Sequence, residues 1–226
     1  MNIQIAIDGP GGAGKSTIAK ALAKKLGIIY VDTGALYRAV GLYVRSRDVD
    51  PHDASAVAAL LPEISLALRY ENGSQQVYLN GDATGDRIRT PEMSMYASAV
   101  SAIPAVRAFL LDTQRDIAAK NGVVMDGRDI GTVILPNANV KIYLTASEEC
   151  RAKRRFLELQ EKGIATTFEE VLADMRCRDH NDSTRAVAPA VAAPDAVTVD
   201  SSDLSIEACV AKIEAIVAEK TGIGRS

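Results

Sequence analysis

The chain has 226 residues, a length between one and two domains of the usual size of about 150 residues. Its composition, 47% hydrophobic and 24% charged, excludes a wholly disordered chain. The formal net charge of −3 gives no pervasive basic surface, so we expect no nucleic-acid partner. The longest uncharged stretch, residues 93–106, contains Pro104 and is too short to cross a bilayer, so we expect no membrane association. Three cysteines without a CxxC pair predict reduced thiols and a cytoplasmic location.

Short apolar runs alternate along the chain with segments of helical periodicity. The first run, residues 3–7, leads through a glycine-rich turn into a helix that ends at Gly27, and a second strand follows over residues 28–31. Apolar strands separated by helices are typical of an α/β fold with a parallel sheet covered on both faces. The later strands are expected over residues 123–125, 140–144 and 196–199, and their helices over 147–163 and 205–220.

One segment departs from this alternation. Apolar residues occupy every second position from Ile64 to Tyr70, and the pairs Asn72-Gly73 and Asn80-Gly81 predict turns on either side of a second strand. This antiparallel hairpin predicts an inserted subdomain rather than an independent domain. Two helices should follow it, opened by Pro91 and Pro104.

Just upstream of this insert, the sequence predicts a further helix start. We expect Asp50 to cap it, with Pro51 at its first position and His52 on the surface.

Residues 9–16 match the pattern G-x-x-x-x-G-K-[ST] between the first strand and the first helix. Glycines allow backbone N–H groups to converge on phosphate oxygens, and the helix N-terminus adds positive potential. Lys15 would reach the β- and γ-phosphates of a nucleoside triphosphate, and the Ser16 hydroxyl would coordinate Mg²⁺. The chain lacks the Asn-Lys-x-Asp and Leu-Ser-Gly-Gly-Gln motifs, which disfavours a GTPase switch and a transporter ATPase.

Two further segments carry candidate phosphate-binding groups. Thr33 could cap the helix after the second strand, and Arg38 could reach an anion near that helix start, although this segment taken alone favours a plain capped helix with a surface arginine. Asp126 ends a buried strand, the usual place of a carboxylate that holds a Mg²⁺-bound water, with Arg128 and Asp129 on the turn beyond it. An ordinary Asp-Gly turn with a local ion pair is the alternative. The 16 arginines against 10 lysines favour a second phosphorylated ligand.

Four motifs, DGPGGAGKST, DTGALYRAV, DGRDIGTV and RAVAP, stand in the same order as in the bacterial cytidylate kinases, which are P-loop nucleoside monophosphate kinases. The resemblance runs from Ile3 to about Lys220. It implies one P-loop kinase domain over residues 1–226, with a mainly parallel five-stranded sheet flanked by helices. The expected parts are a core (about residues 1–32, 104–150 and 186–226), a monophosphate-binding region with the antiparallel hairpin insert (about 33–103), and a short lid with an arginine-rich loop (about 151–185).

The resemblance also implies the activity: in-line transfer of the γ-phosphoryl group of ATP to CMP and dCMP, with Mg²⁺ as cofactor, by a monomer. Two alternatives stay open at this point. One is a P-loop kinase for another small acceptor such as UMP, AMP or a metabolite alcohol, and the other is a nucleotide sensor without catalysis.

The site residues below follow from the family's motifs. Thr33, Arg38, Arg128 and Arg185 would bind the acceptor phosphate, Ser98, Arg107 and Asp129 the cytosine, and Arg178 and Asp182 the ribose hydroxyls. Lys15, Asp126, Arg128 and Arg185 would be catalytic, and Ser16 would hold Mg²⁺ through ATP. The ATP-binding residues would be Gly9, Pro10, Gly11, Gly12, Ala13, Gly14, Lys15, Ser16 and Thr17.

The residue pattern alone predicts something plainer for several of these positions. Ser98 would pass for core packing, Arg107 for a solvated helix residue, and residues 176–185 for a charged surface loop in which His180 faces solvent. The basic residues at 151–155 fit either a lid over ATP or a helix with Glu/Arg pairs.

Overall fold

The computed structural model describes residues 3–71 and 74–222. The chain forms two compact units, the first made by residues 1–30 and 120–226 and the second by residues 31–119. The expected division into core, monophosphate-binding region and lid stays a prediction.

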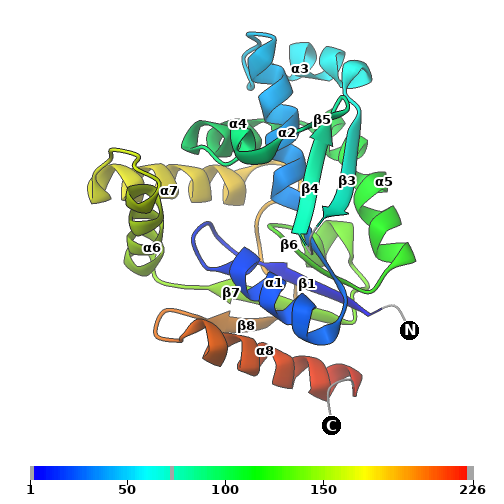
Figure 1. The fold of residues 1–226 in the computed structure, drawn as a ribbon, viewed down its shortest axis with the longest axis vertical. Helices are drawn as coiled ribbons and strands as arrows, with labels where there is room; N and C mark the ends of the chain where they lie inside the picture. The colour runs from blue at the N-terminus through cyan, green and yellow to red at the C-terminus, as the bar shows by residue number, and fades with distance from the viewer. Residues whose placement is uncertain (1–2, 72–73, 223–226) are drawn as a thin grey trace. The chain divides into compact units, whose positions relative to one another are not determined.

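The first unit is built on a five-stranded sheet in the order β2-β6-β1-β7-β8, whose central strand β1 pairs in parallel with β6 and β7 (Figure 1). Strand β8 pairs in parallel with β7, so the predicted mainly parallel sheet is confirmed. The apolar residues of β1 are buried because helices leave neither face of such a sheet to solvent. The strands are β1 (Gln4–Asp8), β2 (Ile29–Asp32), β6 (Val123–Gly127), β7 (Val140–Thr145) and β8 (Val197–Asp200). The last two residues of β2, Val31 and Asp32, belong to the second unit.

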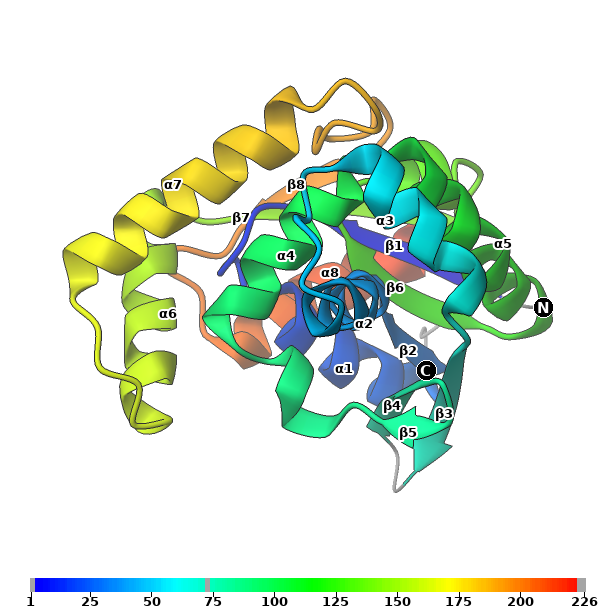
Figure 2. The same ribbon diagram turned by 90° about the horizontal axis from the view of Figure 1, so that it is seen from above.

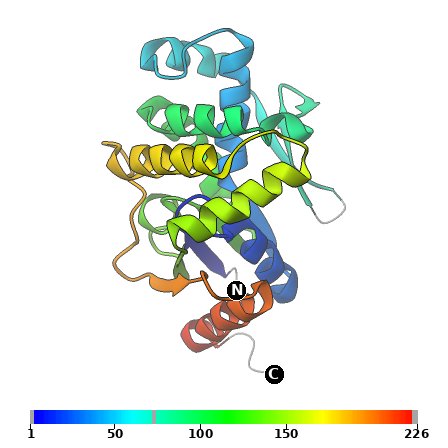
Figure 3. The same ribbon diagram turned by 90° about the vertical axis from the view of Figure 1, so that its left-hand side faces the viewer.

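Helices α1 and α8 lie side by side in the first unit, and both contribute to one apolar cluster with the strands (Figure 1). Leu22 of α1, Leu144 of β7 and Ile213 of α8 are fully buried in it. Helices α6 and α7 pack against each other, as Figure 3 shows. The helices of this unit are α1 (Lys15–Leu26), the short π-helix η3 (Ile130–Ile134), α6 (Glu148–Glu161), α7 (Phe168–Thr184) and α8 (Ile206–Thr221).

The second unit has its own core, in which α2 packs beside α4 (Figure 2). A three-stranded antiparallel sheet in the order β3-β4-β5 accompanies them. Its helical elements are α2 (Thr33–Ser46), α3 (Ala54–Leu60), η1 (Leu61–Glu63), η2 (Gly85–Ile88), α4 (Pro91–Ser101) and α5 (Pro104–Lys120), the last residue of which belongs to the first unit. Its strands are β3 (Leu66–Glu71), β4 (Ser74–Leu79) and β5 (Asp82–Ala83).

The predicted hairpin insert is present as β3 and β4. Asn80 and Gly81, between β4 and β5, both have positive φ, 51° and 91°, as a two-residue hairpin turn requires. The other predicted turn, Asn72-Gly73, lies outside the described residues.

No single described helix is long and apolar enough to cross a membrane. Helices α4 and α5 together have the length and apolar composition of a membrane span, but the chain bends by 99° between them. Their apolar residues Val100, Val106 and Leu110 are buried in the core of the second unit.

Two predicted helix caps are wrong by a few residues. Helix α3 is capped by Asp53, whose carboxylate accepts from the N–H groups of Ser55 and Ala56, while Asp50 accepts from the N–H of His52 in the preceding turn. Both aspartates fit the cap consensus, and Pro51, which is common at the first position of a helix, led to the choice of Asp50. Helix α2 is capped by Asp32, not Thr33, because the longer acidic side chain reaches the N–H of Ala35 at 2.9 Å.

The stretch 176–185, expected to be a surface loop, is helical up to Thr184 as the second half of α7. Thr167 and Glu170 form a capping box at the start of this helix, upstream of the stretch 176–185. The exposure of His52 and of His180 is confirmed.

A backbone contact at Gly9 yields the first test. An ideal Cβ at this residue would lie 1.9 Å from the carbonyl oxygen of Leu144, and φ is +146°. Gly27 also has a positive φ, +64°, but its Cβ would meet nothing within 4 Å. We expect Gly27→Ala to cost about 1 kcal/mol of unfolding free energy, and Gly9→Ala about 3 kcal/mol or more because β1 and β7 must separate. Urea denaturation of both variants checks this, and equal losses would contradict it.

Candidate functional site

The glycine-rich loop between β1 and α1 is shaped as an anion site. Gly12 and Gly14 adopt left-handed φ values of 73° and 88°, and Gly14, the N-cap of α1, makes no side-chain cap to the first-turn N–H groups. The N–H groups at such a helix start attract phosphate oxygens. Lys15 follows directly, buried, and its Nζ donates to the carbonyl oxygen of Pro10 at 2.7 Å. The predicted strand–loop–helix context of the motif is confirmed.

The surroundings of Lys15 disfavour the charged form of its side chain. Burial lowers the pKa of its ammonium well below the usual value, and the nearby Arg128 lowers it further, against the opposing effect of Asp126. Burial removes the water that would stabilise this ammonium. An anionic ligand restores that stabilisation through its negative charge, so a buried cation gains more from the ligand than an exposed one.

Asp126 and Ser16 meet at the edge of the sheet. The Ser16 hydroxyl donates to Asp126 Oδ2 at 2.9 Å, and the Tyr30 hydroxyl donates to Oδ1 at 2.9 Å. Proteins usually hold Mg²⁺ through one or two oxygen ligands, with phosphates and water completing the octahedron. A hydroxyl and a buried carboxylate beside a phosphate loop fit that pattern. The structure thus brings together the two side chains that the sequence analysis assigned to Mg²⁺, and those roles stay predictions.

Asp8, the last residue of β1, connects the end of this strand to the segment after β6. Its carboxylate oxygens accept from the N–H groups of Ile130 and Gly131, each at 2.8 Å. Burial raises the pKa of Asp8 to about 6, although these N–H groups favour the charged form. The contact fixes the chain just after Arg128 and Asp129 against the end of β1.

The predicted acceptor-side residues of the first unit form three ion-pair contacts, two of which share Asp182. Arg128 Nε donates to Asp182 Oδ2 at 3.0 Å, and Arg178 lies 3.8 Å from the same oxygen. Arg185 Nη2 donates to Asp129 Oδ1 at 3.3 Å, with both side chains buried. Helix α7 thus brings polar side chains to the turn after β6. The contacts fix the positions of the side chains that the sequence analysis assigned to a phosphate and its sugar.

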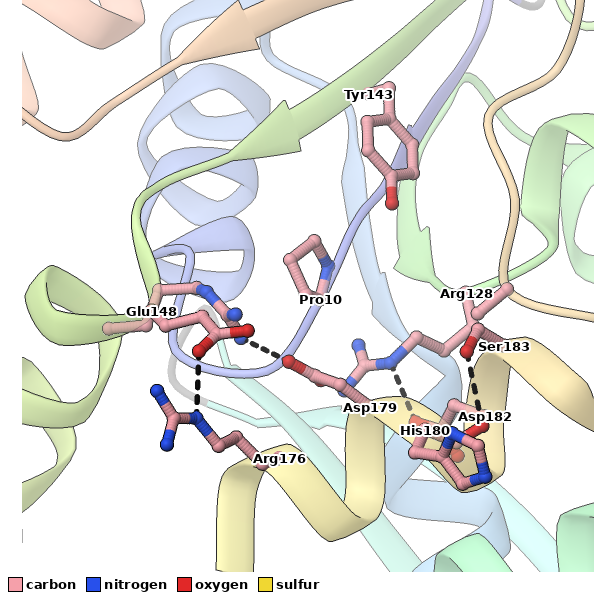
Figure 4. A pocket seen from close by; sticks show the side chains of 11 residues that line it. Pro10, Arg128, Tyr143, Glu148, Arg176, Asp179, His180, Asp182 and Ser183 are labelled. Carbon is pink, nitrogen blue, oxygen red and sulfur yellow. Dashed lines mark hydrogen bonds and ion pairs between the residues drawn. The ribbon is translucent and has the colours of Figure 1, made fainter. Parts of the chain in front are cut away.

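A pocket of about 380 Å³ lies between the glycine-rich loop and α7. Figure 4 shows Asp179 projecting from α7 toward Pro10, with Arg128 and Asp182 paired beside it. The lining residues are Pro10, Arg128, Tyr143, Glu148, Arg151, Arg176, Asp179, His180, Asp182, Ser183 and Ala190.

Arg151, one of the basic residues of the predicted lid, contacts the loop itself, and so does Asp179, to which the sequence analysis gave no role. Arg151 Nη1 pairs with the carboxylate of Asp179 and donates to the Gly11 carbonyl oxygen at 3.0 Å, while the Gly11 N–H donates to Asp179 Oδ1 at 3.4 Å. Arg154 instead donates to the Ser201 carbonyl oxygen, and Arg155 pairs with Glu158 three residues on. Among these three arginines, Arg151 is therefore the one that contacts the glycine-rich loop.

In the second unit, Asp32 organises the start of α2. Its Oδ1 accepts from the N–H of Ala35, and its Oδ2 accepts from Arg38 at 2.8 Å and from Arg89 at 3.5 Å. A Cβ on Gly34 would lie 3.1 Å from Arg38 Nη1, so the guanidinium folds over the first turn of the helix. Thr33 is buried there as the first helical residue.

Ser98 and Arg107 are both buried in the second unit, so the expectation of a solvated Arg107 is wrong. Its Nη1 donates to the carbonyl oxygen of Ser101 at 3.2 Å, and its guanidinium lies 5.7 Å from the centre of the Tyr37 ring. A buried arginine is costly unless it is partnered, and such groups are more common at functional sites than elsewhere. That signal could not be seen without the fold.

The sheet, the glycine-rich loop with its buried lysine and the Ser16–Asp126 pair define a P-loop kinase fold. The solved structure of an uncharacterized protein from Eubacterium ventriosum matches 97% of this chain and 99% of its own length, with a TM-score of 0.52 and 15% identity, and it shares this fold.

The family model described as cytidylate kinase matches residues 5–219. A cytidylate kinase of Caldicellulosiruptor bescii is 51% identical over 211 residues, 93% of either chain. One of Fervidobacterium nodosum is 50% identical over 223 residues, 99% of this chain and 100% of the relative. The chain belongs to the cytidylate kinase family, and the resemblance predicted from its motifs is confirmed.

The raised pKa of Asp8 gives a test by pH. The folded state binds the Asp8 proton more tightly than the unfolded state, whose pKa is near 3.8, so the stability it adds is present at low pH and lost as pH rises through about 6. Asp8→Asn removes this dependence. Between about pH 4.5 and about pH 7.5, the wild type should lose about 2 kcal/mol of unfolding free energy relative to the variant. Urea denaturation at both pH values measures it, and a constant or widening difference would show that Asp8 is not shifted upward.

Proposed function

We propose that this kinase transfers the γ-phosphoryl group of ATP to CMP, and to dCMP, by in-line displacement. The observation that carries the proposal is the family match over residues 5–219, which spans both compact units. Family membership favours CMP over UMP, AMP or a metabolite alcohol as the acceptor. It also favours catalysis over a sensor that only binds nucleotide.

The donor ATP would be held by residues 9–17. Backbone N–H groups at the start of α1 would bind its phosphates, and Lys15 would leave the Pro10 carbonyl oxygen for the β- and γ-phosphates. Mg²⁺ held by Ser16, with Asp126 behind it, would neutralise charge on the phosphates when bound. The buried Tyr30 hydroxyl fixes the orientation of the Asp126 carboxylate.

The acceptor phosphate would be bound by arginines. We assign Arg128 and Arg185 in the first unit, and Arg38 with the Thr33 hydroxyl in the second, to this role. Each of the three arginines is already oriented by a carboxylate, Asp182, Asp129 and Asp32 respectively. A phosphate monoester is a competent nucleophile at neutral pH, so positioning and charge neutralisation can supply the catalysis without a general base.

The base would be recognised by Asp129, Arg107 and Ser98. Cytosine presents an amino donor at N4 and acceptors at N3 and O2, which match a carboxylate and a guanidinium. Uracil reverses the donor and acceptor at positions 3 and 4, so a fixed carboxylate disfavours it. Arg178 and Asp182 would bind the ribose hydroxyls.

Water exclusion is the remaining part of the proposal. Residues 151–185, which form most of α6 and all of α7, would close over ATP as the lid and limit wasteful hydrolysis. The protein would act as a monomer in the cytoplasm on small-molecule substrates, without nucleic-acid or membrane partners. Three free cysteines, Cys150, Cys177 and Cys209, support the reducing compartment.

Lys15→Met tests the donor site. It removes the buried cation and keeps most of the side-chain volume, so CMP-dependent release of ADP should fall at least about 100-fold. The wild type should phosphorylate CMP and dCMP well, UMP and AMP poorly, and hydrolyse ATP slowly without acceptor. A coupled ADP-release assay across these acceptors measures all of this. Fast hydrolysis without acceptor, or a better acceptor among UMP and AMP, would contradict the proposal.

Asp129→Asn tests the recognition of the base. Arg185 donates to one oxygen of Asp129, so the amide would keep its oxygen on Arg185 and turn its NH2 toward the N4 donor of cytosine. We therefore expect kcat/KM for CMP to fall about 100-fold while KM for ATP stays within about twofold. Discrimination between CMP and UMP should shrink in the same variant. Asp129→Asn also weakens the ion pair with Arg185, so Arg185→Lys serves as the control. In that control, phosphate binding should weaken while the preference for CMP over UMP is retained. Equal losses for CMP and ATP would refute the assignment.

A further inference from the structure

Gln75, in strand β4 of the hairpin insert, makes an unusual pair of contacts with one distant residue. The N–H of Asp32 donates to Gln75 Oε1 at 2.9 Å, and Gln75 Nε2 donates to the carbonyl oxygen of Asp32 at 3.3 Å. One side-chain amide thus binds both backbone polar groups of a residue 43 positions away in the sequence, as a neighbouring strand would.

Asp32 is also the residue that arranges the start of α2. Its carboxylate caps the helix through the N–H of Ala35 and holds the guanidinium of Arg38 at 2.8 Å. The backbone of Asp32 sets the direction of this carboxylate. Its position in turn sets the guanidinium of Arg38 over the first helical turn.

We propose that Gln75 is a positioning residue for the acceptor phosphate: it fixes Asp32, and Asp32 holds Arg38 in place. The inference rests on the proposed function, in which Arg38 binds that phosphate. A long arginine side chain loses rotamer freedom when it binds, and a residue that orders it beforehand lowers that cost. The hairpin insert therefore contributes directly to acceptor affinity through one side chain.

The hairpin does not depend on the Gln75 side chain for its own fold. Strand β4 pairs with β3 through the backbone over six residue pairs, and Val77 provides the buried apolar contact of the strand. Gln76 is the same residue type at the next position of the same strand, and alternation directs its side chain to the opposite face. It is a matched control.

The test compares Gln75→Met with Gln76→Met. Methionine keeps the length of the side chain and removes both hydrogen bonds. We expect KM for CMP to rise about three- to tenfold in Gln75→Met, with KM for ATP unchanged within about twofold, and neither constant to change in Gln76→Met. Because KM does not depend on the amount of folded enzyme, partial unfolding of a variant leaves the comparison valid.

A double-mutant cycle separates this role from a general structural one. In an Arg38→Ala background, Gln75→Met should raise KM for CMP by less than about twofold, because the group it positions is gone. A full additional increase in that background would overturn the inference, as would equal KM values for Gln75→Met and Gln76→Met with an active wild type. A wild type that does not phosphorylate CMP would instead refute the proposed function itself.

Discussion

The parallel pairing of β1 with β6 on one side and β7 on the other determines where the chemical groups of the first unit lie. Asp8, the last residue of β1, stands opposite Gly127 of β6 and Tyr143 of β7. The three strands end at nearly the same level, so the glycine-rich loop leaves β1 beside Asp126. Backbone contact at Gly9 and the carboxylate of Asp8 then hold the loop and the turn after β6 against this edge. The Ser16–Asp126 contact and the pairs of Arg128 and Asp129 with α7 and its C-terminal end are made from these positions.

Arginines and carboxylates are paired throughout both units. Arg38 is held by Asp32, Arg128 by Asp182, Arg151 by Asp179 and Arg185 by Asp129. Each pair orders a flexible guanidinium, whose five N–H donors allow a phosphate to share the cation with the carboxylate or to replace the carboxylate. The net charge of −3 therefore gives no indication of the local cationic character, because the acids that cancel the arginines stand next to them.

The strands, the glycine-rich loop and the Ser16–Asp126 pair could be predicted because they depend on local apolar runs and on one spaced motif. Helix α7 could not, since residues 176–185 are nearly all polar and give the periodicity of apolar residues nothing to detect. The burial of Arg107 and the contacts of Gln75 with Asp32 depend on residues that are far apart in the chain. The predicted helix caps, Thr33 and Asp50, lie one and three positions from the observed caps, Asp32 and Asp53, because neighbouring residues fit the same consensus.

Burial of Lys15 links phosphate binding to proton binding. The protein surroundings lower the pKa of this ammonium, and an anion in the loop raises it again, so a proton and a phosphate each favour the arrival of the other. As pH rises, affinity for a polyphosphate therefore begins to fall at a lower pH than it would with an exposed lysine. In that range, association draws protons from the buffer, and the measured binding enthalpy includes the ionisation enthalpy of whichever buffer supplies them.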